Sequence, residues 1–308
     1  MPLDPVFEEM LKQMAEAGAP ALIDLPPAEG RALYRAMNET MPQVELLSVT
    51  DKSIPVHEGE IGIRIYRQSD DSAQPCLVFY HGGGWVIGDL ETHDSVCRQL
   101  CREAACTVIA VDYRLAPEFP FPTPVNDCYS ALKWVHDHAS ELSIDPKRLA
   151  VGGDSAGGNL SACMALKARE EGLVLAHQLL IYPVTDTGFD TPSYKENAEG
   201  YMLTLESMQW FWNHYLSADP EGLKNPMAAP MRASSHDGLA PATVITAEFD
   251  PLRDEGEAYG QKLLDAGVPT RIQRYDGMIH GFFGMTHIVQ GARDAMQLAV
   301  SQLQSAFS

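Results

Sequence analysis

The chain has 308 residues, 45% of them hydrophobic, so it can bury a large core and is too apolar for a disordered protein. Its 22 basic and 42 acidic residues give a formal net charge of −20, which would repel nucleic acid and anionic lipid. We therefore expect neutral small molecules as partners. The N-terminus lacks the pattern of a signal peptide, and no stretch is long and apolar enough to cross a bilayer, so a cytoplasmic location is expected.

Six cysteines are too sparse in a chain of this length for a disulfide scaffold, and most are expected to be small buried hydrophobes in a reducing compartment. His93, Cys97 and Cys101 recur at intervals of four, on one face of an expected helix. A metal site would use that spacing, but so would a buried helix face, and no second pair of ligands accompanies it. We therefore predict no metal.

Residues up to about Met41 are predicted to form two helices separated by a break over residues 18–27. The first helix has an apolar stripe opposite an acidic face, which argues against a membrane surface. We expect this helix to lie on the domain, with a lid over a pocket as the alternative. The stripe consists of Val6, Phe7, Met10, Leu11 and Met14.

From Leu46 the pattern changes to alternation, with Ile61, Ile63 and Ile65 on one strand face after a turn at residues 57–60, which predicts an antiparallel start. Strands then alternate with helices, the pattern of a mostly parallel sheet that is covered on both faces and binds ligands beyond its C-terminal edge. The expected strands cover residues 76–80, 107–111, 148–152, 178–182, 242–247 and 270–275. The expected helices cover residues 92–103, 124–138, 156–171, 252–266 and 292–303.

A long segment between the strands at residues 178–182 and 242–247 is rich in large apolar residues. A connection of this length is usually functional, so we expect helices that form a cap together with the N-terminal segment. The alternative is an ordinary helix packed on the core. The expected cap comprises residues 1–45 and 184–225, and the catalytic domain residues 46–183 and 226–308. The expected substrate contacts are Trp85, Tyr201, Met202, Leu203 and Phe211.

A G-x-S-x-G turn centred on Ser155 joins an apolar run to a helical pattern of small residues. A sharp strand-to-helix turn holds the serine hydroxyl clear of the backbone, and the helix start supplies free N–H groups. A passive glycine-rich turn is the alternative. Three consecutive glycines follow the strand at residues 76–80, and the N–H groups of Gly83, Gly84 and Ala156 are predicted to form an oxyanion hole. A phosphate-binding loop is disfavoured because the glycines are followed by no lysine.

A serine nucleophile needs a base, and the base needs an acid that orients it. Asp250 and His280 each follow a predicted strand, at the same sheet edge as Ser155, and their order along the chain is that expected after a nucleophile elbow. We predict His280 as the base and Asp250 as the acid. The rival bases are His236 and His287, and the rival acids are Glu248 and Asp254.

Together these motifs resemble the hormone-sensitive-lipase-like carboxylesterases of the α/β-hydrolase superfamily. The matching residues are HGGG at 81–84, DYRLAPE at 112–118, GDSAGG at 153–158, DPLRDEG at 250–256 and HGF at 280–282. The resemblance runs from about residue 45 to the C-terminus. It implies an α/β-hydrolase fold with a mostly parallel eight-stranded sheet, flanking helices and a helical cap.

The resemblance also implies a serine carboxylesterase without cofactor or metal, with Ser155, Asp250 and His280 as its triad. The apolar cap favours short to medium acyl chains. An amidase, arylformamidase or thioesterase on the same triad is the alternative, and a non-catalytic small-molecule binder is disfavoured because His280 is present. The partner is a small-molecule ester, and a homodimer is compatible with the resemblance.

Overall fold

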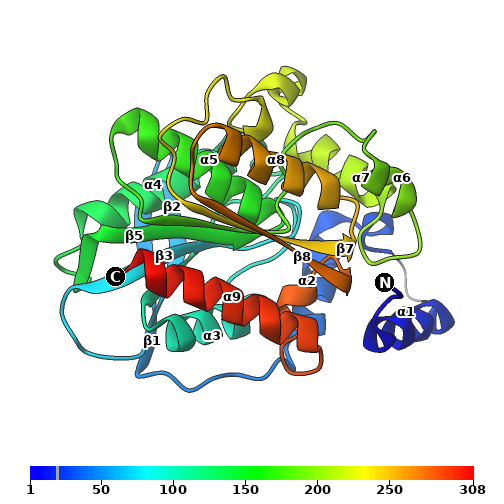
Figure 1. The fold of residues 1–308 in the computed structure, drawn as a ribbon, viewed down its shortest axis with the longest axis horizontal. Coiled ribbons are helices and arrows are strands. Elements are labelled where there is room, and N and C mark those ends of the chain that lie inside the picture. Colours follow the sequence, from blue (N-terminus) through cyan, green and yellow to red (C-terminus); the bar gives the residue numbers. More distant parts are fainter. Residues whose placement is uncertain (19–20) are drawn as a thin grey trace.

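The protein, seen here in a computed structural model that describes residues 1–18 and 21–308, is built on one eight-stranded sheet in the order β1-β2-β4-β3-β5-β6-β7-β8. Figure 1 shows the sheet edge-on between its helices. The strands are β1 (Ser48–Val56), β2 (Gly59–Arg67), β3 (Gln74–Tyr80), β4 (Thr107–Asp112), β5 (Ile144–Asp154), β6 (His177–Ile181), β7 (Ala242–Phe249) and β8 (Thr270–Ile279). The predicted fold class is confirmed.

The expected antiparallel start is also confirmed, because β1 and β2 form a hairpin and β2 pairs antiparallel with β4. The hairpin reverses at Glu58, which has a φ of 58°, and at Gly59, where φ is 147°. From β4 onward all pairings are parallel. The carboxyl ends of these parallel strands therefore meet at one edge.

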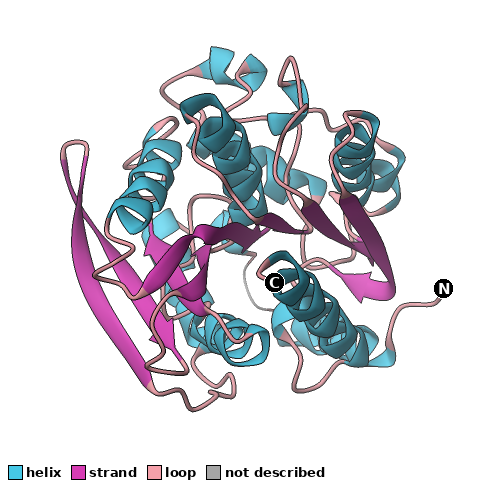
Figure 2. Cartoon of the chain, turned by 60° about the vertical axis from the view of Figure 1, so that its left-hand side comes forward, coloured by secondary structure: helices cyan, strands magenta, loops and turns pink. Residues whose placement is uncertain are grey.

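Helices cover both faces of the sheet (Figure 2), and β3 shows why. Its residues alternate between two apolar clusters: Cys76, Val78 and Tyr80 belong to one, and Leu77 and Phe79 to the other. With both faces of the strand apolar, each face needs a helical layer. One layer contains α3 (Asp94–Ala104) and α9 (Gln290–Ala306); the other contains α4 (Thr123–Asp137), α5 (Ala156–Glu171) and α8 (Arg253–Asp265).

All six cysteines are buried and unbridged, as expected for small apolar side chains. Cys97 and Cys101 lie in the apolar cluster on the α3 side of the sheet. His93 directly precedes α3 and contacts Asp154. Among the described residues, no group of three or more potential ligands could hold a metal ion.

The N-terminal helices and the insertion after β6 lie at the carboxyl end of the sheet (Figure 1). The N-terminal elements are α1 (Pro5–Ala17), a 3₁₀ turn (Leu22–Asp24) that contacts α7, and α2 (Pro27–Asn38). Residues 19 and 20 of the expected break lie outside the described residues. The insertion contains α6 (Pro192–Glu196), α7 (Leu205–Tyr215) and the 3₁₀ turns Pro220–Lys224 and Pro230–Arg232.

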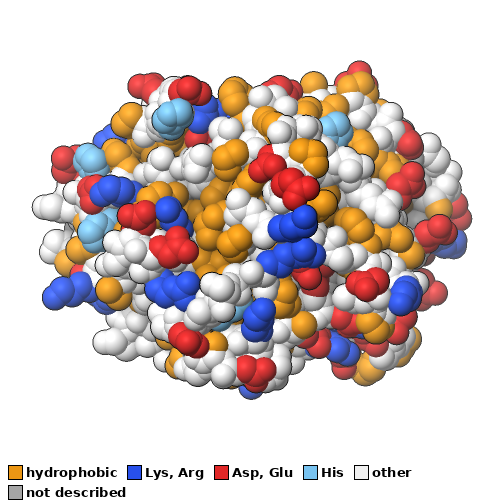
Figure 3. All heavy atoms as spheres, turned by 90° about the horizontal axis from the view of Figure 1, so that it is seen from above, with side chains coloured by type: hydrophobic (Ala, Val, Ile, Leu, Met, Phe, Trp, Pro, Cys, Tyr) orange, Lys and Arg blue, Asp and Glu red, His pale blue; other side chains and the backbone are white. Residues whose placement is uncertain are grey.

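α1 lies on the domain beside the end of β8 rather than on the insertion. Its apolar stripe buries only Phe7 fully, and the Asp4 N–H donates to the Gly277 carbonyl at 3.0 Å. Acidic, basic and apolar side chains are interspersed over the face above α5 and α8 (Figure 3). Over the described part of the chain, every helix falls short of the length and apolarity that a bilayer span requires.

Candidate active site

Ser155 stands at the junction between β5 and α5, with a φ of 55° and a ψ of −118°. Such a backbone is strained for a residue with a side chain and persists only where its surroundings enforce it. The flanking glycines permit the turn, since a Cβ on Gly153 or Gly157 would lie 2.2 or 1.9 Å from the Tyr80 carbonyl oxygen. Ser155 as a whole is 8% exposed, so the residue is largely enclosed.

A continuous chain of hydrogen bonds joins the three residues that the sequence places at this edge. Ser155 Oγ lies 2.9 Å from His280 Nε2, and His280 Nδ1 lies 2.7 Å from Asp250 Oδ2. Asp250 is fully buried, and its other carboxylate oxygen accepts from the Leu252 N–H at 2.8 Å. The imidazole is therefore held from one side by a carboxylate and faces a hydroxyl on the other.

The loop after β3 brings free N–H groups to the same place. Gly83 and Gly84 have φ values of 107° and 57°, and a Cβ on Gly83 would lie 2.3 Å from the Ile87 carbonyl oxygen. Within the described chain, the N–H groups of Gly83, Gly84 and Ala156 make no hydrogen bond, whereas the neighbouring Gly82 N–H is already bonded. These three donors are free to bind an oxygen that gains negative charge.

A buried carboxylate, that of Asp154, fixes the base of this loop to the elbow. The Gly82 N–H donates to Asp154 Oδ1 at 3.0 Å, and the same oxygen lies 3.2 Å from His93 Nε2. Burial alone would raise the pKa of Asp154, but the charge and hydrogen bond of His93 outweigh it and hold that pKa below its usual value. The carboxylate next to Ser155 therefore stays ionised and bound to the loop.

His81, the first residue of the loop, is buried and serves structure rather than proton transfer. Burial lowers the pKa of His81 to about 4, so its imidazole is neutral near pH 7. Its ring stacks on Tyr113 at a centroid distance of 4.3 Å, and the Tyr113 hydroxyl donates to the His81 carbonyl at 2.7 Å. These contacts clamp the loop from below.

The rival residues are engaged elsewhere. His236 Nε2 bonds the Pro230 carbonyl at 3.0 Å and His287 is exposed. Glu248 pairs with the N-terminal amine at 2.6 Å, and Asp254 Oδ2 accepts from the Ser193 N–H at 2.7 Å. None of these contacts leads to Ser155.

The expected substrate contacts lie in different places. The expectation for Trp85 is wrong for this structure: its indole is fully buried, stacked on Tyr215 at 4.1 Å and tilted against Trp212 at 4.7 Å, so it is a packing residue. Trp85 has a φ of 60°, a backbone angle that a residue with a side chain rarely adopts. Leu203 is likewise buried in the apolar cluster that contains Trp85.

The other expected contacts lie beside the functional loops. The Phe211 ring lies on Gly84, where an added Cβ would come within 2.1 Å of it. Met202 Sδ is 3.7 Å from the position of a Cβ on Gly281, next to His280. Tyr201 packs on Phe249 at a ring distance of 5.1 Å, at the end of β7.

Two contributors were not found by sequence reasoning. The Tyr182 ring packs against His280 at 4.5 Å, and Arg31 on α2 bonds the carbonyls of Val86 and Ala116 at 2.8 and 2.9 Å. Arg31 also pairs with Glu118 at 2.6 Å, so α2 is fastened across the outer side of the glycine loop. The position of Tyr182 directly after β6, at the functional edge, was a usable signal; for Arg31 the sequence offers none.

The assembled groups suit acyl transfer. A hydroxyl, a base in contact with it, a carboxylate that orients the base and three unbonded N–H groups are the parts needed to attack a carbonyl and stabilise the resulting oxyanion.

Comparison with known proteins agrees with this chemistry. A family described as having the alpha/beta hydrolase fold matches residues 77–284. The carboxylic ester hydrolase LipN of Mycobacterium tuberculosis is 42% identical over 99% of this chain and 84% of its own length. The ethyl acetate hydrolase of Pseudomonas putida is 37% identical over 83% of this chain and 82% of its own. The structure of a hyperthermophilic esterase from the archaeon Pyrobaculum calidifontis superposes with a TM-score of 0.94 at 40% identity, covering 99% of both chains.

Proposed function

Since the chain belongs to the hormone-sensitive-lipase-like carboxylesterases of the α/β-hydrolase superfamily, we propose that it hydrolyses carboxylic esters through Ser155, His280 and Asp250. Its identity as a carboxylic ester hydrolase follows from its relatives. The observation that carries the residue assignment is the unbroken chain from Asp250 through His280 to Ser155, with links of 2.7 and 2.9 Å.

In the proposed mechanism, neutral His280 takes the Ser155 proton at Nε2 while the oxygen attacks the ester carbonyl. Asp250 accepts the Nδ1–H, which fixes the tautomer and stabilises the imidazolium that forms. His280 then protonates the leaving alcohol, and a water molecule, deprotonated by the same nitrogen, releases the acid from Ser155.

The tetrahedral oxyanion is proposed to bind the N–H groups of Gly83, Gly84 and Ala156. Their lack of other hydrogen bonds supports this role, because donors that are already aimed and free cost no reorganisation during the reaction. Removing one such donor typically costs about 2.7–4 kcal/mol of transition-state stabilisation.

Short to medium acyl chains are the proposed substrates. Phe211 already lies against Gly84, one of the proposed oxyanion donors, which supports a small acyl group. The relative named ethyl acetate hydrolase points the same way. Rates on p-nitrophenyl esters of increasing chain length test this, and preference for long-chain emulsions would contradict it.

The N-terminal segment and residues 184–225 are proposed as the cap over this site. The contact of the 3₁₀ turn Leu22–Asp24 with α7 and the bonds of Arg31 across the glycine loop support a cap made of both parts. A homodimer stays a prediction, which light scattering of the purified protein tests.

The assignment of Ser155 is tested by comparing the unmodified protein with Ser155→Ala on an ester panel. We expect hydrolysis to fall by about 10⁴-fold or more, with binding of a substrate analogue retained. Ser161→Ala is the matched control, because it removes another buried hydroxyl of α5, one that bonds only the Gly157 carbonyl at 2.8 Å. Full activity in Ser155→Ala would overturn the assignment.

A further inference from the structure

The loop that carries Asp250 takes hydrogen-bond donors from the insertion as well as from Arg253 at the start of α8. Asn197, which follows α6, donates its side-chain amide to the Asp250 carbonyl at 3.2 Å and to the Glu248 carbonyl at 3.4 Å. The Ser193 hydroxyl of α6 donates to the next carbonyl, that of Pro251, at 2.6 Å. Three carbonyls at the end of β7 are thus bonded by two side chains from one short helical segment.

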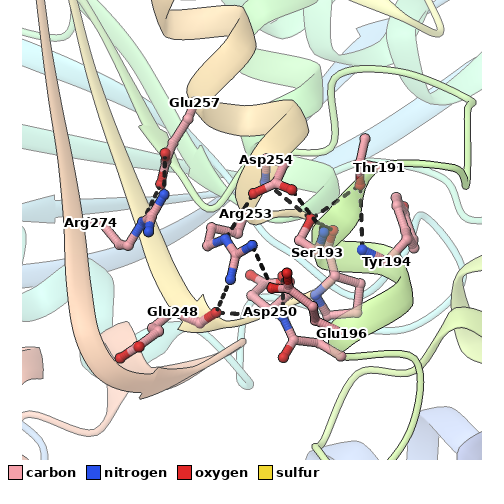
Figure 4. Close-up of polar contacts among 12 residues, drawn as sticks. Thr191, Ser193, Tyr194, Glu196, Glu248, Asp250, Arg253, Asp254, Glu257 and Arg274 are labelled. Atoms are coloured by element: carbon pink, nitrogen blue, oxygen red, sulfur yellow. Dashed lines mark hydrogen bonds and ion pairs between the residues drawn. The ribbon is translucent and has the colours of Figure 1, made fainter. Parts of the chain in front are cut away.

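Ser193 also completes the start of α8. The residue that precedes this helix is Leu252, which has no side-chain acceptor, so α8 has no cap of its own. Instead the Asp254 N–H donates to Ser193 Oγ at 3.2 Å, while Asp254 Oδ2 accepts from the Ser193 N–H at 2.7 Å. Each helix start is capped by a side chain of the other, as Figure 4 shows.

Burial makes these bonds consequential. Ser193 and Asp250 are fully buried and Asn197 is 3% exposed, so water cannot replace a lost donor. The Asp250 and Glu248 carbonyls also accept from the N–H and Nη1 of Arg253 at 3.2 and 3.0 Å, so loss of Asn197 removes one of two donors to each. Among the described residues the Pro251 carbonyl accepts from Ser193 alone, and a buried carbonyl without a partner is strongly disfavoured. A second contact between α6 and the start of α8 is weaker: Arg253 pairs at 2.9 Å with Glu196, whose side chain is 58% exposed.

We propose that Asn197 and Ser193 are positioning residues for Asp250: α6 of the insertion holds the backbone of this loop so that the carboxylate meets His280. This rests on the proposed function of Asp250. The carboxylate has one oxygen on His280 and one on the Leu252 N–H, so a displacement of its backbone changes both bonds together. The insertion thereby contributes to proton transfer as well as covering the site.

The first test is Asn197→Ala, measured with a p-nitrophenyl ester. We expect kcat to fall by about 10–100-fold with KM little changed, because misplacing a catalytic group by about 1 Å can cost on the order of 10²-fold. Ser193→Ala should act in the same direction, and Ser193→Thr, which keeps the hydroxyl, should restore activity.

A double-mutant cycle separates positioning from general support of the fold. In an Asp250→Asn background, where the ionised partner of His280 is already gone, Asn197→Ala should cause no further loss of kcat. Thr243→Ala is the matched control: it removes a buried hydroxyl near the start of β7, at the end of the strand opposite to the Asp250 loop, that bonds His177 Nε2 at 2.9 Å. It should lower thermal stability and leave kcat close to that of the unmodified protein.

Three results would overturn the proposal: an unchanged kcat in both Asn197→Ala and Ser193→Ala, a loss that multiplies fully with that of Asp250→Asn, or an equal loss in Thr243→Ala. The proposed function fails differently, through an Asp250→Asn or Ser155→Ala protein that keeps full activity. If Asn197→Ala does not fold, the Ser193→Ala and Ser193→Thr pair decides the question.

Discussion

The two halves of the site are held together by different means. On the nucleophile side, the elbow and the glycine loop meet backbone to backbone, and a Cβ on Gly157 would lie 2.8 Å from the His81 carbonyl oxygen. On the acid side, the Asp250 loop is held by the side chains of Ser193 and Asn197 from the insertion. The first half tolerates no added atoms, whereas the second depends on donors that a single substitution can remove.

Burial shifts the pKa of a titratable side chain in opposite directions in the two halves. Burial lowers the pKa of His81, under the glycine loop, to about 4, and it raises the pKa of Glu255, on α8 near the Asp250 loop, to about 8. Glu255 Oε1 accepts from the N–H groups of Thr185 and Asp186 at 2.6 and 3.3 Å. The contribution of the nucleophile side to folding stability therefore falls in acid, and that of the acid side falls in alkali.

After Ser155→Ala, the largest effect is expected on the acid side, from Asp250→Asn. The amide keeps the shape of the residue but favours the wrong tautomer of His280, so kcat should fall by about 10³–10⁴-fold with little change in KM. Steady-state kinetics on one ester measures this. A loss below tenfold would mean that the acid half is not part of the proton transfer.

A smaller loss, about 10²–10³-fold in kcat, is expected on the nucleophile side from Gly84→Ala. The added methyl would collide with Phe211 and strain a φ of 57°, displacing an oxyanion donor. Gly172→Ala is the control, because Gly172 has a φ of 75° but nothing within 4 Å of the added Cβ. Equal losses in both variants would show that backbone strain, not the donor, is responsible.

The smallest effect on activity is expected from Glu255→Gln, which tests the contrast in pH dependence. A carboxyl whose pKa is raised from 4.5 to about 8 contributes stability that is fully present below pH 4.5 and is lost as pH rises to about 8. The midpoint of urea unfolding should therefore fall with pH in the unmodified protein and fall less in Glu255→Gln. Parallel curves for the two proteins would contradict the pKa shift.

In the same experiment, the contribution of His81 to stability changes with pH in the opposite direction. Its pKa is lowered from 6.5 to about 4, so the unfolded chain takes up the proton first. Its contribution to stability is fully present above pH 6.5 and is lost as pH falls toward 4. Glu255→Gln should leave this acid limb unchanged.

The sequence alone predicted the nucleophile side well because its information is local. The strand before Ser155, the glycines around it and the helix after it are contiguous, and the expected helix at residues 156–171 matches α5 in both bounds. The antiparallel start and the mostly parallel sheet were also predicted from hydrophobic patterning, whereas the strand order was not. Most other helices and strands begin or end a few residues away from their predicted bounds; β8, for example, continues to Ile279.

The acid side was only partly predictable because its partners are distant and carry no pattern. Asp250 was found from its place after a strand, but Ser193 and Asn197 are short polar residues in an insertion without periodicity. Trp85 was misassigned for a different reason. The residue that follows Gly84 can point into the site or into the core. Its unusual backbone angle, a φ of 60°, is not visible in the sequence.

The central claim, that Ser155 is the nucleophile, is tested most directly by reaction with an organophosphate ester followed by peptide mass spectrometry. We predict one adduct per chain, on the peptide that contains Ser155, appearing in step with loss of hydrolysis and absent from Ser155→Ala. An adduct on another residue that forms equally in Ser155→Ala and abolishes its activity would contradict the claim.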